Sequence, residues 1–132
     1  MAPEVVTGES YGKECDVYSF AIIMYEMLAE KLPYYDVPNQ VNLQMRAAMS
    51  GTFRPTLTED IRTRPPGILL TGGREAKLQV PEFVLETLDK YIELMKQCWV
   101  HNPSDRPSID AVFERLQSLS EVLEKDWPSP TV

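Results

Sequence analysis

Residues 16–30 read DVYSFAIIMYEMLAE, a stretch with neither glycine nor proline in which apolar side chains recur at almost every position. Wound into a helix, these side chains cover the whole circumference, which indicates a helix that is buried on all sides. Asp16 is a suitable N-cap, because a carboxylate accepts hydrogen bonds from the free amides of a first turn, and Pro33 prevents a long continuation. The stretch therefore predicts a buried helix over 16–30.

Residues 39–50 predict a second, shorter helix. Val41, Met45 and Ala48 would lie on one stripe of that helix and face the core. The helix is expected to end at Gly51, because glycine readily adopts the left-handed conformation that helix C-termini require.

Two longer helices are predicted in the C-terminal half of the chain. Residues 81–100 predict an amphipathic helix, because their apolar residues recur at steps of three and four: Leu85, Leu88, Ile92, Met95 and Trp99. Ser108 is predicted to cap the last helix, whose apolar stripe is Ile109, Val112, Phe113, Leu116 and Leu123. No useful run alternates with the period of a strand, so the predicted fold class is all-α.

The composition sets bounds on the class of protein. The chain has 132 residues, 43% of them hydrophobic and 25% charged, as expected for one globular domain. Its net charge of −7 and its scattered basic residues argue against a nucleic-acid partner. No apolar run reaches the roughly 20 residues that span a bilayer, so no membrane segment is predicted. The two cysteines and the lack of a signal-peptide pattern predict free thiols and a cytoplasmic protein.

The predicted domain spans residues 1–126 and contains an inserted loop, and a tail follows it. Residues 56–80 contain Pro65-Pro66-Gly67 and Gly72-Gly73 and predict a long loop inserted between helices. Residues 127–132, WPSPTV, cannot continue a helix and predict a flexible tail.

A search for catalytic, cofactor-binding and metal-ligating sets gives none. The only histidine, His101, precedes Asn102-Pro103 in a turn and has no evident partner for a nucleophilic pair. Cys15 and Cys98 are far apart and in no Cys/His cluster. We therefore predict no catalytic, cofactor or metal residue in this chain.

Several motifs, in order along the chain, resemble those of eukaryotic protein kinases. Ala2-Pro3-Glu4 resembles the element that closes the activation segment, and Asp16-Val17-Tyr18-Ser19-Phe20 resembles the start of the central helix of the C-terminal lobe. Cys98-Trp99, followed by residues 102–108 (NPSDRPS), resembles the closing segment of tyrosine-kinase and tyrosine-kinase-like domains. The chain departs from this pattern at four positions, with small changes: Cys15 for Ser, Tyr18 for Trp, Ala21 for Gly and Asn102 for Asp.

The resemblance implies scaffold roles for four residues. It implies a buried ion pair between Glu4 and Arg106, which ties the activation segment to the helical lobe. It implies that Asp16 holds the backbone of the catalytic loop. Trp99, in the closing segment, is expected to be part of the core rather than of a site.

The resemblance also implies what this chain does not carry. In the family, the Gly-rich loop, the strand lysine and the Mg²⁺-binding residues precede Ala-Pro-Glu, whereas this sequence begins at Met1. The expectation is therefore an incomplete C-terminal helical subdomain whose parent kinase uses Mg·ATP and whose partner is the N-terminal part of that domain. The alternatives are a stand-alone kinase-like helical module that binds or regulates another protein without catalysis, and an unrelated all-α interaction domain.

Overall fold

The computed structural model describes residues 1–58, 61 and 81–126, and every regular element within them is helical. In chain order these elements are α1 (Pro3–Val6), α2 (Glu14–Ala29), α3 (Leu43–Ser50), α4 (Glu82–Cys98), the short 3-10 helix η3 (Pro103–Asp105) and α5 (Ile109–Asp126). The predicted all-α class is confirmed. Most of the predicted insertion at 56–80 and all of the tail at 127–132 lie outside the described residues.

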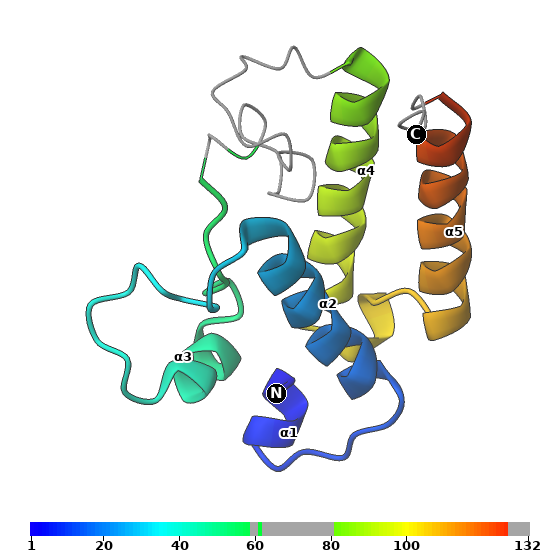
Figure 1. The fold of residues 1–132 in the computed structure, drawn as a ribbon. Coiled ribbons are helices and arrows are strands. Elements are labelled where there is room, and N and C mark those ends of the chain that lie inside the picture. Colours follow the sequence, from blue (N-terminus) through cyan, green and yellow to red (C-terminus); the bar gives the residue numbers. More distant parts are fainter. Residues whose placement is uncertain (59–60, 62–80, 127–132) are drawn as a thin grey trace.

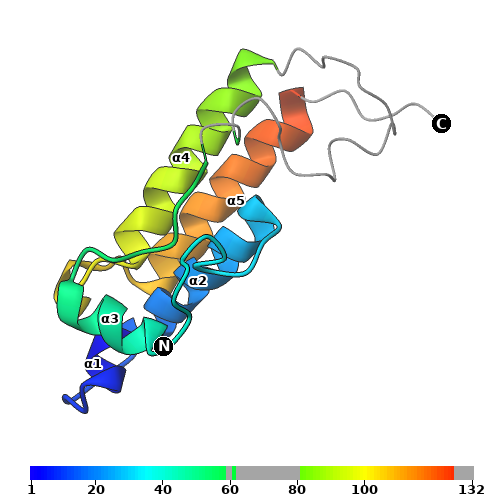
Figure 2. The same cartoon turned by 90° about the vertical axis from the view of Figure 1, so that its left-hand side faces the viewer.

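The helices form one bundle around α2. Figure 1 shows α4 and α5 side by side and running in opposite directions, with η3 at the turn between them, and α2 crossing beside α4. Figure 2 shows the short helices α1 and α3 together at one end of the bundle. The N-terminal element and the turn before α5 are thus brought to the same end of the molecule.

The core lies between α2, α4 and α5. The Tyr91 hydroxyl of α4 donates a hydrogen bond to the Met24 carbonyl of α2 at 2.9 Å, which links the two helices directly. The ring centroids of Tyr25 and Trp99 are 6.4 Å apart. The buried cluster comprises Ala2, Val17, Tyr18, Ala21, Met24, Tyr25, Leu94, Met95, Cys98, Trp99 and Val112.

Helix α2 differs from its prediction at the start and in its burial. It begins at Glu14, so Asp16 lies inside the first turn and no side chain caps this end, which corrects the predicted N-cap. It ends at Ala29, where Glu30 adopts a left-handed conformation with φ 56°. Burial on all sides would need a further element beside α2 that the described residues do not supply, and Ile23 is accordingly 50% and Met27 65% exposed.

Helix α3 buries only one residue of its predicted stripe, Ala48. Val41 precedes the helix and is 65% exposed, and Met45 is 42% exposed, whereas Ala47 and Ala48 are buried. The small alanine side chains let α3 pack closely on α1, which the longer methionine would prevent. The end at Gly51 is confirmed, with the left-handed φ of 73°.

Helix α5 is capped as predicted but only partly buried. The Ser108 Oγ accepts a hydrogen bond from the Ala111 N–H at 3.2 Å, which confirms the cap. Val112 is 1% exposed, but Ile109 and Phe113 are 48% and 65% exposed, so two of the five residues of the predicted stripe face away from the core. The reason is that α5 packs mainly on α4 and therefore buries only a narrow face.

Candidate functional site

The chain's two predicted ion-pair partners meet at the lower end of the bundle. Arg106, at the C-cap of η3, donates from Nη1 to Glu4 Oε1 at 2.6 Å and from Nη2 to Glu4 Oε2 at 3.0 Å. The two side chains are 0% and 4% exposed. This forked geometry matches a planar guanidinium to a planar carboxylate and fixes both in one orientation. The contact joins residues 102 positions apart in the sequence.

Arg106 also holds three backbone carbonyls. Its Nε donates to Val100 at 2.9 Å, its Nη1 to Glu14 at 2.9 Å and its Nη2 to His101 at 3.1 Å. A guanidinium has five N–H groups, and together with the Glu4 bonds all five are used. Arg106 therefore connects α1, the first residue of α2 and the turn that follows α4.

The environment of Glu4 keeps its carboxylate charged. Burial alone would raise the pKa of Glu4, but the hydrogen bonds and charge of Arg106 outweigh that effect, and the pKa lies below its usual value. The ionised pair is thus the stable form at neutral pH.

Sequence reasoning did not find Arg54 as a second cation beside this pair. Both guanidinium groups lie close to the Tyr18 ring, with Arg106 Cζ 5.0 Å and Arg54 Cζ 5.1 Å from its centroid. Arg54 also donates from Nε to the Trp99 carbonyl at 2.8 Å and from Nη1 to the Ala47 carbonyl at 3.2 Å. In the sequence, Tyr18 was the residue that could have indicated a nearby cation, because the face of an aromatic ring attracts positive charge.

The other two predicted scaffold residues are placed differently. Trp99 is 6% exposed and packs in the core, as expected for a structural residue. Asp16 is exposed on the first turn of α2, and its Oδ1 accepts only from the Cys15 Sγ at 3.8 Å within the described residues. The structure therefore joins Glu4 to Arg106 but brings neither to Asp16. The role of Asp16 toward a catalytic loop stays a prediction.

Reactive and metal-binding groups form no cluster in the described ranges. Within these residues no group of three or more His, Cys, Asp or Glu side chains is placed to hold a metal ion. Burial raises the pKa of the Cys98 thiol to about 11, so this thiol is neutral at physiological pH and a poor nucleophile. Inside the same ranges, none of the helices has the length and apolar character that crossing a bilayer requires.

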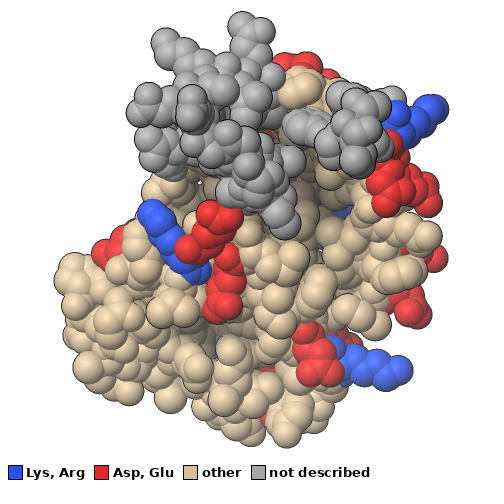
Figure 3. All heavy atoms as spheres, viewed as in Figure 1, with Lys and Arg blue, Asp and Glu red and all other residues tan. Residues whose placement is uncertain are grey.

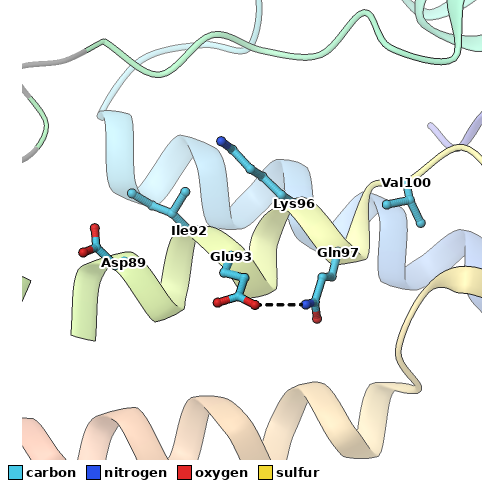
Figure 4. Close-up of a pocket in the computed structure, with 6 residues that line it drawn as sticks. All are labelled: Asp89, Ile92, Glu93, Lys96, Gln97 and Val100. Carbon is cyan, nitrogen blue, oxygen red and sulfur yellow. Dashed lines mark hydrogen bonds between the residues drawn. The ribbon is translucent and has the colours of Figure 1, made fainter. Parts of the chain in front are cut away.

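A shallow hollow lies along α4 and is drawn in Figure 4. Its lining is Asp89, Ile92, Glu93, Lys96, Gln97 and Val100. Gln97 donates to Glu93 at 3.4 Å and accepts from Arg115 of α5 at 2.6 Å, so its amide serves to join the two helices. All six residues come from one helix and the residue two places after it, whereas binding sites usually gather polar groups from several elements. The hollow is therefore not a convincing ligand site.

The sequence matches a known family over most of its length. A family model described as "Protein kinase domain" matches residues 1–118, which include the Glu4–Arg106 pair and all of the core.

Curated relatives include proteins of Dictyostelium discoideum and of humans. A probable serine/threonine-protein kinase of Dictyostelium discoideum is 32% identical over 126 residues, or 96% of this chain. The dual specificity protein kinase shkD of the same organism is 32% identical over 124 residues, and human mitogen-activated protein kinase kinase kinase 7 is 30% identical over 120 residues, each covering 90% of this chain. The chain spans only 6%, 12% and 15% of the length of these three proteins.

Proposed function

The chain belongs to the protein kinase domain family, and from that membership we propose that it forms the C-terminal helical part of a kinase domain of the tyrosine-kinase-like type. The observation that carries the proposal is the buried ion pair between Glu4 and Arg106. It fastens the Ala-Pro-Glu element to the turn before the last helix, as the resemblance implies for an activation segment anchored to the helical lobe. The chain's own task is therefore mechanical: it holds the end of the activation segment in a fixed position.

The whole domain would transfer the γ-phosphoryl group of Mg·ATP to a hydroxyl of a protein substrate in the cytoplasm. Two of the relatives are named as a serine/threonine kinase and a dual specificity kinase, which supports a protein hydroxyl as the acceptor. Phosphoryl transfer depends on positioned charges and on Mg²⁺, and the family places those groups ahead of Ala-Pro-Glu. In this proposal, the N-terminal part of the domain holds Mg·ATP, and residues 1–126 form the helical part that supports the activation segment.

A chimera tests the proposal. Residues 1–126 of this chain would replace the matching segment of human mitogen-activated protein kinase kinase kinase 7, and phosphoryl transfer would be measured beside the native kinase. We expect the chimera to retain transfer and an R106A chimera to lose it. The isolated chain should give no heat on isothermal titration with Mg·ATP. A chimera that melts cooperatively but transfers no phosphate would contradict the proposal, as would micromolar Mg·ATP binding by the isolated chain.

The second candidate is a stand-alone kinase-like helical module that binds or regulates another protein. For this candidate, the exposed apolar pair Ile23 and Met27 on α2 is the surface that a bound protein would cover. The two candidates differ in one outcome. A stand-alone module would be a monomeric, cooperatively melting chain even when the chimera is inactive.

A further inference from the structure

The segment between α2 and α3 carries two adjacent tyrosines in opposite environments. In Figure 1 this segment stands out from the helices, on the left of the view. Tyr34 is 7% exposed, and its neighbour Tyr35 is 38% exposed. The two residues share one turn and almost one sequence context, so the difference between them comes from the fold alone.

Tyr34 is fixed in place by three contacts. Its hydroxyl donates to the Phe53 carbonyl at 3.3 Å, and its ring stacks on the Phe53 ring at a centroid distance of 4.8 Å. Its backbone carbonyl accepts from the Gln40 side chain at 2.9 Å. An enzyme could reach the Tyr34 hydroxyl only after local unfolding of this segment.

A lysine side chain lies against the ring of Tyr35. The Lys31 Nζ lies 4.4 Å from the ring centroid, and the Tyr35 N–H donates to the Leu32 carbonyl at 3.2 Å within the turn. In the described part of the chain the Tyr35 hydroxyl has no hydrogen-bond partner. We propose that Tyr35 is a phosphoacceptor for a tyrosine-specific protein kinase, with Lys31 as the counter-charge of the phosphate.

The reaction needs only the modifying kinase and Mg·ATP. The phenol oxygen of Tyr35 forms a bond to the γ-phosphorus of ATP, the bond from that phosphorus to the ADP oxygen breaks, and the phenol proton leaves to a base of the modifying kinase. The product carries a charge of about −1.5 to −2 at pH 7 next to the Lys31 ammonium. The ammonium can then leave the ring face and pair with the phosphate.

The site adjoins a contact between α2 and the backbone after α3. The Tyr25 hydroxyl of α2 donates to the Thr56 carbonyl at 2.9 Å. Burial raises the pKa of Tyr25 to about 12, and the nearby Tyr35 and Asp36 add to this effect. A phosphate on Tyr35 would therefore change the electrostatic potential at the contact between α2 and Thr56.

Labelling of the full chain tests the proposal. The chain would be incubated with Mg·ATP and the purified catalytic domain of a tyrosine kinase of broad substrate tolerance, and site occupancy would be read by peptide mass spectrometry. Tyr11, 63% exposed in the segment between α1 and α2, serves as a reference for simple accessibility. We expect Tyr35 to be labelled at least as fast as Tyr11 and more than 10-fold faster than Tyr34, and Y35F to lose that signal. Labelling of Tyr11 without Tyr35 would overturn the proposal, as would equal rates at Tyr35, Tyr34 and the core residue Tyr18.

A second measurement tests the role of Lys31. In a phosphorus NMR titration of the phosphorylated chain, we expect the second phosphate pKa to lie below the usual value of about 6 and to rise in K31A. An unchanged pKa in K31A would overturn the assignment of Lys31 as the counter-charge.

Discussion

Arg106 connects several parts of the fold that are far apart in the sequence. Each of its five N–H groups has an acceptor, on Glu4 or on the carbonyls of Glu14, Val100 and His101. A buried pair of this kind contributes little compared with apolar residues of similar volume, yet removal of one partner strands the other charge. Substitution of Arg106 should therefore destabilise the fold strongly, because it leaves the buried Glu4 carboxylate without its counter-charge.

The first prediction is a double-mutant cycle on this pair. Arg106→Ala should lower the free energy of unfolding by about 3–5 kcal/mol, because Glu4 stays buried without its counter-charge. The double variant Glu4→Ala/Arg106→Ala should cost much less than the sum of the single changes, as measured by urea denaturation. Arg115→Ala is the matched control, since Arg115 donates to Gln97 at a half-buried site and, among the described residues, to no other group; its loss should cost about 0.5–1.5 kcal/mol. Strict additivity of the two changes would count against the pair.

The second prediction concerns acid stability. Folding lowers the pKa of Glu4, so its contribution is fully present above the unfolded value of about 4.3 and is lost as the pH falls through the folded value. We expect the difference in urea midpoint between the native chain and Glu4→Gln to be large at pH 7 and to shrink as the pH falls below about 4. A difference that stays constant down to pH 3 would show that the carboxylate charge makes no contribution.

Helix α2 shows that the position of a residue on a helix decides how much it contributes to stability. Met24 and Met27 are three positions apart, yet Met24 is 1% and Met27 65% exposed. Met24 lies on the side where Tyr91 of α4 bonds to the α2 backbone. The two residues form a matched pair, identical in chemistry and helix but opposite in burial.

The third prediction compares alanine substitutions at these two sites. Met24→Ala should cost about 2–5 kcal/mol, because it removes buried apolar area and leaves a cavity. Met27→Ala should change the free energy of unfolding by about 0.5 kcal/mol or less. Thermal and urea unfolding of both variants would measure this. Equal costs would mean that the Met27 face is covered in solution, by self-association for instance.

On the surface of the molecule, charged side chains and exposed apolar side chains occupy different areas. Figure 3 shows charged side chains over α5 and across the middle of this face, while the area over α3 in the lower left shows neither sign of charge. Val41, Met45 and Met49 are exposed at spacings of four residues in this region. Ile23 and Met27 of α2 are exposed as well, and exposed apolar side chains that form a contiguous patch usually mark an interaction surface.

The fourth prediction follows from that surface. The isolated chain should bind a hydrophobic dye and scatter light at rising concentration, and Met27→Lys should reduce both signals. Glu26→Gln, one position earlier on the exposed side of α2, also raises the net charge by one and is the control for the change in charge alone. Addition of the N-terminal part of a related kinase domain should suppress dye binding if it covers α2. A monodisperse monomer without dye binding would favour the stand-alone module.

The sequence by itself determined the helical class, the four longer helices and the residues of the ion pair. Helix periodicity and the absence of strand alternation are local properties, so α2, α3, α4 and α5 were predictable to within a few residues. The caps Ser108 and Gly51 were also local signals and were confirmed. Glu4 and Arg106 were found through the kinase motifs that contain them, since no local rule joins residues 102 positions apart.

Only the tertiary structure decided which faces are buried. The apolar stripes gave no means to separate Met24 from Met27, or Ala48 from Met45, because a side chain's burial depends on which distant helix packs against it. The same holds for Tyr34 and Tyr35, which differ because Tyr34 contacts Phe53 and Gln40 and is thereby buried. Asp16 looked like an N-cap, yet the helix began at Glu14, whose carbonyl is held by Arg106. Local sequence preferences determined where helices form. Long-range contacts determined the residue at which α2 begins and which helix faces are buried.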